Sequence, residues 1–94
     1  MAVVHTVLFK MRRPEDAERG AERLRAMAGR IEGVRSLEVG LDQLGGPRSW
    51  HLALTVRVDD WDALEAYAEH PEHVPVKTAL AEAAEEVAVV DYEV

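Results

Sequence analysis

The chain of 94 residues contains no cysteine, which excludes disulfides, thiolate metal ligands and a cysteine nucleophile. Basic residues are also in the minority, since 11 Lys and Arg stand against 18 Asp and Glu. A general nucleic-acid binder needs a basic face to displace counterions from phosphate, so we expect no nucleic-acid partner. No apolar run approaches the roughly 20 residues of a membrane span, so we expect no membrane partner either. These absences fit a cytoplasmic protein.

The composition indicates a single globular domain over residues 1–94. Hydrophobic residues make up 48% of the chain, more than a disordered segment carries. The first thirteen residues, MAVVHTVLFKMRR, make a poor signal peptide, because the basic residues follow the apolar run instead of preceding it.

Hydrophobic periodicity predicts four strands and two helical regions. A period of two indicates the strands, and apolar steps of three and four indicate the helices. The order predicts a ferredoxin-like α+β fold: a four-stranded antiparallel sheet, helices on one face, and the first and third strands at the centre. The expected segments are a strand at 2–10, a helix from Pro14 that Gly33 ends, strands at 34–41 and 50–58, a helix after Asp59 or Asp60 that breaks at His70-Pro71, a helix from Pro75, and a strand at 87–94.

The first helix and the loop between the two middle strands have distinct compositions. The loop DQLGGPRS, residues 42–49, contains two glycines and a proline, so we expect a flexible turn. The helix carries one apolar stripe for the core. Its members are Ala17, Ala21, Leu24, Ala28 and Ile31.

The predicted sheet is apolar on both faces, although two helices can cover only one. The exposed face of an antiparallel sheet is normally polar, so a second apolar face needs cover. We therefore expect a homodimer in which two sheets pack face to face and form a shared barrel. We place Val4, Thr6, Leu8, Leu52, Leu54, Val56, Val90, Tyr92 and Val94 on the uncovered face, and Val3, Val7, Phe9, Val87 and Val89 on the other.

The segment YAEHPEHVPV, residues 67–76, gathers a tyrosine and two histidines around a proline. A residue before proline avoids helical backbone, so we expect the chain to turn at His70 and to point His73 back at the sheet. We also expect His5 and His51 to share the helix-covered face beneath Tyr67. A histidine can remove a proton beside a carbonyl group, and a phenol can donate a hydrogen bond to the enolate oxygen.

Less specific interpretations of the same residues remain open. A strand histidine such as His5 is often a core residue bonded to backbone or water, and Tyr67 can simply pack its ring. His70 fits a helix end, where a cation is favoured. The proline between His70 and His73 disrupts helical i,i+3 chelation, and no HExxH motif is present, so we expect no metal. Asp91 at most offers a carboxylate to a hard cation.

Four segments in order, HTVLFKMR, EGVRSLEVG, YAEHPEHVPV and AVVDYEV, resemble the stress-responsive dimeric α/β-barrel (Dabb) family over essentially the whole chain. The resemblance implies the dimeric barrel. One plant branch of the family, olivetolic acid cyclase, closes a linear polyketide by an intramolecular aldol step without a cofactor. Its segment Y-x-x-H-P-x-H matches Tyr67 and His73, and its strand histidines match His5 and His51.

The resemblance itself implies little about function, and two interpretations stay open. One is a stress-related protein that holds an apolar or carbonyl ligand, and the other is a cofactor-independent polyketide cyclase. A monooxygenase of the wider dimeric-barrel group, with heme or without a cofactor, is a third. A cavity filled by Phe9, Trp61 and Leu80 would instead indicate a structural role. We expect Tyr67 and His73 to be catalytic, and the substrate-binding residues to be His5, Val7, Phe9, Leu24, His51 and Val87.

Overall fold

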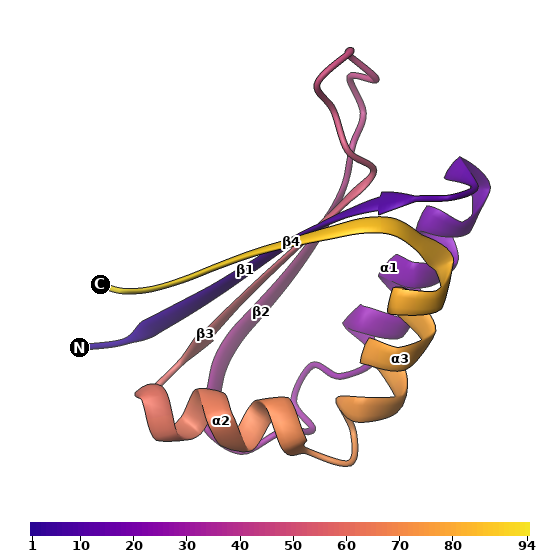
Figure 1. The fold of residues 1–94 in the computed structure, drawn as a ribbon. Helices are drawn as coiled ribbons and strands as arrows, with labels where there is room; N and C mark the ends of the chain where they lie inside the picture. The colour runs from indigo at the N-terminus through magenta and orange to yellow at the C-terminus, as the bar shows by residue number, and fades with distance from the viewer.

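A computed structural model describes all 94 residues. Its four strands form one antiparallel sheet in the order β2-β3-β1-β4. The helices cover one face of this sheet, and the other face stays open (Figure 1). The predicted ferredoxin-like fold, with the first and third strands at the centre, is confirmed. The elements are β1 (Val3–Met11), the 3-10 turn η1 (Pro14–Asp16), α1 (Ala17–Arg25), β2 (Val34–Leu41), β3 (Leu52–Val58), α2 (Trp61–Glu69), α3 (Val74–Ala83) and β4 (Ala84–Glu93).

Helix α1 ends at Arg25, well before the predicted stop at Gly33. The next residues form tighter turns: the Met27 N–H donates to the Leu24 carbonyl, and the Ala28 N–H to the Arg25 carbonyl, each at 3.1 Å. Such turns have three residues each, so the apolar stripe moves from Leu24 to Met27. Met27 is buried and Ala28 is exposed, so the prediction for Ala28 was wrong.

The strand register corrects the predicted faces of the sheet. On β1 and β3, His5 lies opposite Val56, Val7 opposite Leu54 and Phe9 opposite Leu52. Leu52, Leu54 and Val56 therefore point toward the helices and belong to the buried core, not to the open face. The same register turns His51 away from the face that carries His5. Alternation along one strand shows which residues share a side, but it does not show how two strands are paired.

The open face is apolar on one half only. Leu8, Val90 and Tyr92 are exposed there, on the neighbouring strands β1 and β4. The half on β2 and β3 is polar, with Glu38 paired with Thr55. The unshielded apolar surface is therefore smaller than predicted, and it is concentrated along the β4 side.

The break between α2 and α3 follows from two local signals. The Asp60 carboxylate accepts a hydrogen bond from the Ala63 N–H at 2.8 Å and fixes the start of α2. His70 is extended, with φ −65° and ψ 138°, as expected before Pro71. The chain then turns, and His73 occupies the N-cap position of α3 without a capping hydrogen bond from its side chain. No helix is both long and apolar enough to cross a membrane.

Candidate functional site

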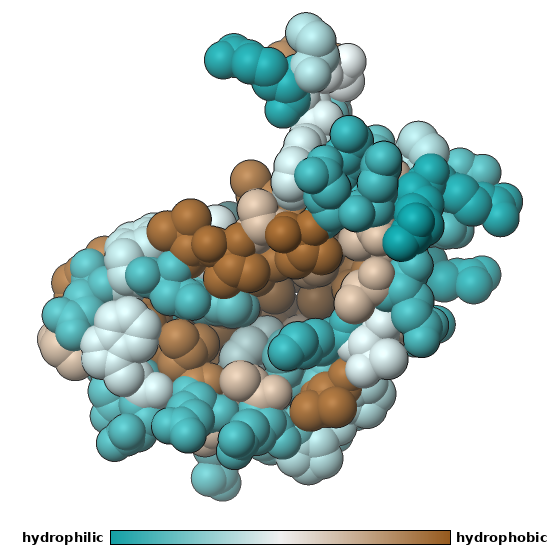
Figure 2. Space-filling model, viewed as in Figure 1, coloured by the Kyte–Doolittle hydropathy of each residue, from teal (hydrophilic) through white to brown (hydrophobic).

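A cavity of about 510 Å³ lies between the helix-covered face of the sheet and helices α2 and α3. Seventeen residues line it and twelve of them are hydrophobic, so it suits a mostly apolar molecule. Phe9, Trp61 and Leu80 form part of its wall and do not fill it. In the space-filling view, a hollow opens beside a band of apolar side chains (Figure 2). The volume falls within the range of small-molecule sites.

Tyr67, on α2, lies at the cavity wall with a hydroxyl group that has no partner within the protein. Its side chain is 1% exposed, and its Oη atom is buried without a hydrogen bond. Such orphaned groups are rare, because each costs about 1–3 kcal/mol of desolvation. Burial also raises the pKa of Tyr67 to about 12, so the phenol is neutral and keeps its proton. Tyr67 is therefore a hydrogen-bond donor without an acceptor.

His73 is held against Tyr67 in a fixed orientation. Its Nδ1 lies 3.0 Å from the Ala68 carbonyl oxygen, and the ring centroids of Tyr67 and His73 are 4.3 Å apart. A carbonyl only accepts hydrogen bonds, so Nδ1 carries the proton and Nε2 of the neutral ring is a free base. Burial lowers the pKa of His73 and outweighs the Ala68 carbonyl, which raises it; the positive charge of Lys77 lowers it further.

His5 and Asp91 form a second polar pair at the cavity wall. They face each other on β1 and β4, with Nδ1 of His5 2.5 Å from Oδ1 of Asp91. The carboxylate accepts a hydrogen bond from Nδ1–H, so Nδ1 carries the proton and Nε2 of His5 is a second free nitrogen. The His5 ring lies edge-on to Tyr67, with centroids 5.8 Å apart. Three groups that can donate or accept a proton therefore meet at one apolar cavity.

The sequence did not reveal Asp91 as the partner of His5. The signal was present, however, because Asp91 has the same strand parity as Val87 and Val89, which were placed on the helix-covered face. A carboxylate on an otherwise apolar face needs a partner. Four predicted substrate-binding residues besides His5 line the cavity together with Tyr67 and His73; they are Val7, Phe9, Leu24 and, across on β4, Val87.

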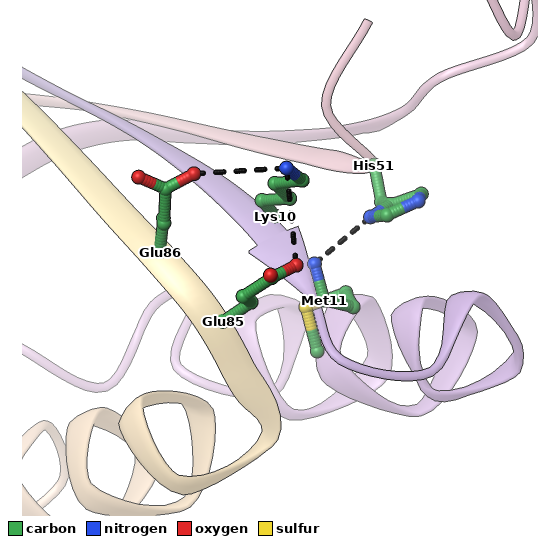
Figure 3. A network of polar contacts seen from close by, with 5 residues as sticks. All are labelled: Lys10, Met11, His51, Glu85 and Glu86. Atoms are coloured by element: carbon green, nitrogen blue, oxygen red, sulfur yellow. Dashed lines mark hydrogen bonds and ion pairs between the residues drawn. The ribbon is translucent and has the colours of Figure 1, made fainter.

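His51 does not line the cavity, contrary to expectation. Its Nδ1 accepts a hydrogen bond of 2.8 Å from the Met11 N–H, and its own N–H donates to the Phe9 carbonyl at 3.0 Å. Figure 3 shows His51 held at the end of β1, close to Lys10, which pairs with two glutamates of β4. His51 therefore anchors the loop that precedes β3. The histidine pair expected on one face is replaced by His5 with Asp91.

No three side chains of the metal-ligating types lie close enough together to hold a metal ion. His70, the other histidine of the YAEHPEHVPV segment, is not among the residues that line the cavity. Its Nδ1 accepts a hydrogen bond of 3.0 Å from the Glu72 N–H, within the turn after α2. This is the helix-end role that its position before Pro71 predicts.

The family model of the stress responsive A/B barrel domain matches residues 3–94. The chain belongs to this family. An uncharacterized protein of Streptomyces coelicolor is 38% identical over 74 residues, which cover 73% of this chain and 76% of that protein. A dimeric protein of unknown function and ferredoxin-like fold from Bacteroides fragilis is 37% identical, with a TM-score of 0.86 and coverage of 99% and 96%. A dimeric ferredoxin-like protein of Thermobifida fusca shares the fold, with a TM-score of 0.89, 21% identity and coverage of 100% and 92%.

Burial of Tyr67 should make the folded protein less stable at alkaline pH. Its pKa is about 12 in the folded chain and close to 10 in the unfolded chain, so the unfolded state loses the proton first as pH rises. The free energy of unfolding should therefore fall between pH 10 and 12, by about 2–3 kcal/mol more in wild type than in Tyr67→Phe. Urea unfolding at several pH values measures this difference, and parallel pH dependences in the two proteins would contradict it.

Proposed function

We propose that this member of the stress responsive A/B barrel family binds a small, mostly apolar carbonyl compound in the cavity. The Tyr67 hydroxyl donates a hydrogen bond to the carbonyl oxygen of the ligand. The observation that carries the proposal is the buried hydroxyl without a partner, beside an apolar cavity of about 510 Å³. A carbonyl oxygen supplies the acceptor that the protein does not, and the surrounding side chains accept the apolar remainder of the ligand.

Calorimetric titration with two probes of similar size tests this binding mode. Benzoylacetone carries two carbonyl groups, whereas butylbenzene carries none. Wild type should bind benzoylacetone more tightly than butylbenzene, and Tyr67→Phe should lose about tenfold in affinity for benzoylacetone alone. Tyr92→Phe removes a hydroxyl from the open face and serves as the matched control. Equal affinity of wild type and Tyr67→Phe for benzoylacetone would refute the proposed hydrogen bond.

The second candidate function is a cofactor-independent cyclase, and the orientation of two histidines favours it. Each has its Nδ1 bound to an acceptor, Ala68 for His73 and Asp91 for His5, so that each keeps a free Nε2. In an aldol closure, one Nε2 would take a proton from the carbon between two carbonyls of a polyketide-like chain. The resulting carbanion would attack a distant carbonyl of the same chain and form a carbon–carbon bond. Tyr67 would donate to the developing oxyanion, and the new alkoxide would take a proton back.

Asp91 tests the part played by His5 in this reaction. In Asp91→Asn the amide can donate to Nδ1 of His5, which moves the His5 proton to Nε2 and removes the free base. We expect the rate of ring closure with poly-β-keto thioesters to fall by about 10²-fold. Asp91→Glu keeps the carboxylate and should restore part of the rate. Nitrogen-15 NMR should show Nδ1 of His5 protonated in wild type and Nε2 protonated in Asp91→Asn; an unchanged tautomer and rate would contradict this role.

We further propose that two copies associate through the open face of the sheet. Leu8, Val90 and Tyr92 are exposed on that face, and burial of such side chains stabilises a dimer. The Bacteroides fragilis relative, which aligns with nearly the whole chain at 37% identity, is described as dimeric. In this dimer the two sheets lie at the centre, and the cavity of each copy lies on the outer, helix-covered side of its sheet.

A further inference from the structure

The loop between β2 and β3 stands out from the rest of the molecule. Figure 1 shows this segment, residues 42–51, rising away from the helices on the side of the open sheet face. We call it the arm. Leu44 near its tip is 88% exposed, more than any other large hydrophobic residue of the chain. A single exposed apolar side chain is common, so Leu44 supports a contact only together with the apolar surface beside the arm.

Internal hydrogen bonds give the arm a defined shape, although its glycines and proline predicted a flexible turn. The Gly45 N–H donates to the Asp42 carboxylate at 2.8 Å. The Gly46 N–H donates to Oγ of Ser49 at 3.1 Å, and the Ser49 N–H donates back to the Gly46 carbonyl at 3.0 Å. Gly45 has a positive φ of 64°, which a glycine adopts without strain. The arm therefore consists of two linked turns, so little conformational entropy would be lost when it docks.

His51 fixes the direction in which the arm leaves the sheet. Its backbone carbonyl accepts from the Asp42 N–H at 2.9 Å and closes the base of the arm. Its ring and its N–H are bound to the backbone of β1 at Met11 and Phe9. His51, which is absent from the cavity, thus attaches the arm to β1, one of the two central strands of the sheet (Figure 3).

A groove of about 380 Å³ lies in the corner between the arm and the open face. Leu8 and Ala53 form its floor on the sheet, and Trp50 and Arg48 form the side that belongs to the arm. Because Leu8 and Ala53 are paired across β1 and β3, the floor is continuous with the apolar half of the open face. The groove and the exposed residues of β1 and β4 form one surface.

We propose that the arm of each copy clasps the second copy of the dimer, with Leu44 packed against the partner and the groove filled by the partner. This inference rests on the proposed dimer and adds the residues that fix it. The arm projects on the side where a face-to-face partner would lie, and the relative with 37% identity is dimeric by its description. A two-fold axis makes the contact reciprocal, so that two arms hold each dimer.

Leu44→Asp tests the clasp without disturbing the fold, because the side chain is 88% exposed. The charged residue would have to be buried against the partner, twice per dimer, so the dissociation constant should rise about 100-fold. Val74→Asp is the matched control, since Val74 is an exposed apolar residue on α3, on the helix side. Sedimentation velocity over a dilution series gives the dissociation constant of each protein. Circular dichroism checks that the variants fold.

The outcomes separate the clasp from the dimer itself. A weakened Leu44→Asp dimer beside unchanged Val74→Asp supports the clasp. If wild type is a dimer and Leu44→Asp has the same dissociation constant, the clasp is overturned but the proposed dimer is not. A wild type that is monomeric throughout overturns both. The chain has no cysteine, so Leu44→Cys adds a second readout: its maleimide labelling should be about tenfold slower in the dimer than after dilution to monomer, and equal rates would also overturn the clasp.

Discussion

Replacing His73 with alanine should lower the rate of ring closure of poly-β-keto thioesters by about 10²- to 10⁴-fold relative to wild type. His73 is the buried base whose Nδ1 is fixed by the Ala68 carbonyl and whose ring stacks on Tyr67. Burial lowers its pKa below the usual value of 6.5, so the ring is neutral at pH 7 and remains a base at somewhat lower pH. The rate above the spontaneous background is measured by product formation across pH 5–8. As the pH is lowered, this rate should fall only once His73 takes up a proton.

His70→Ala is the matched control for this experiment. His70 lies three residues away in the same segment, but its ring is bound within the local turn and is absent from the cavity wall. Its loss should leave the rate within about threefold of wild type. If His73→Ala and wild type close the ring equally fast above background, the proposed role of His73 as the base is refuted, although ligand binding by Tyr67 would still stand.

Tyr67→Phe should have opposite effects on activity and on stability. The phenol is proposed to donate to the developing oxyanion, so its removal should lower the rate by about 10²- to 10³-fold. The same hydroxyl is buried without a partner, so its removal should raise the free energy of unfolding by about 1 kcal/mol when no ligand is bound. Urea unfolding and the ring-closure assay measure both changes on the same protein.

A residue that merely packs in the core would not produce this pair of effects. Loss of both activity and stability in Tyr67→Phe would mean that the hydroxyl makes a structural hydrogen bond. Unchanged activity with raised stability would mean that the hydroxyl is a strained group without a functional role. Tyr92→Phe, on the open face, controls for loss of a tyrosine hydroxyl elsewhere.

The fold was predictable because its elements carry strong local signals. Alternation along β1 and β3, the Asp60 cap and the proline after His70 each act over a few residues, and the structure agrees with all of them. The end of α1 was not predictable in the same way. Its stripe continues in sequence, but the chain changes from helix to tighter turns after Arg25, and this change moves the buried position to Met27.

The candidate site also combines features that are encoded locally with features that depend on strand register. Tyr67 and His73 lie six residues apart, and the break between α2 and α3 that brings their rings together is encoded locally. The His5–Asp91 pair joins strands at opposite ends of the chain, and it depends on the register of β1 with β4. His51 was misplaced for the same reason, because strand parity does not specify register.

The claim that the Tyr67 hydroxyl donates a hydrogen bond to a carbonyl ligand can be tested directly by NMR on protein labelled with carbon-13 at Cζ of tyrosine. The chain has only two tyrosines, and Tyr92→Phe leaves the Tyr67 resonance alone. Saturation with benzoylacetone should move this resonance as the hydroxyl gains a hydrogen bond, whereas saturation with butylbenzene should leave it close to its starting position. A Tyr67 resonance that responds to both probes alike, or to neither at saturation, would contradict the account.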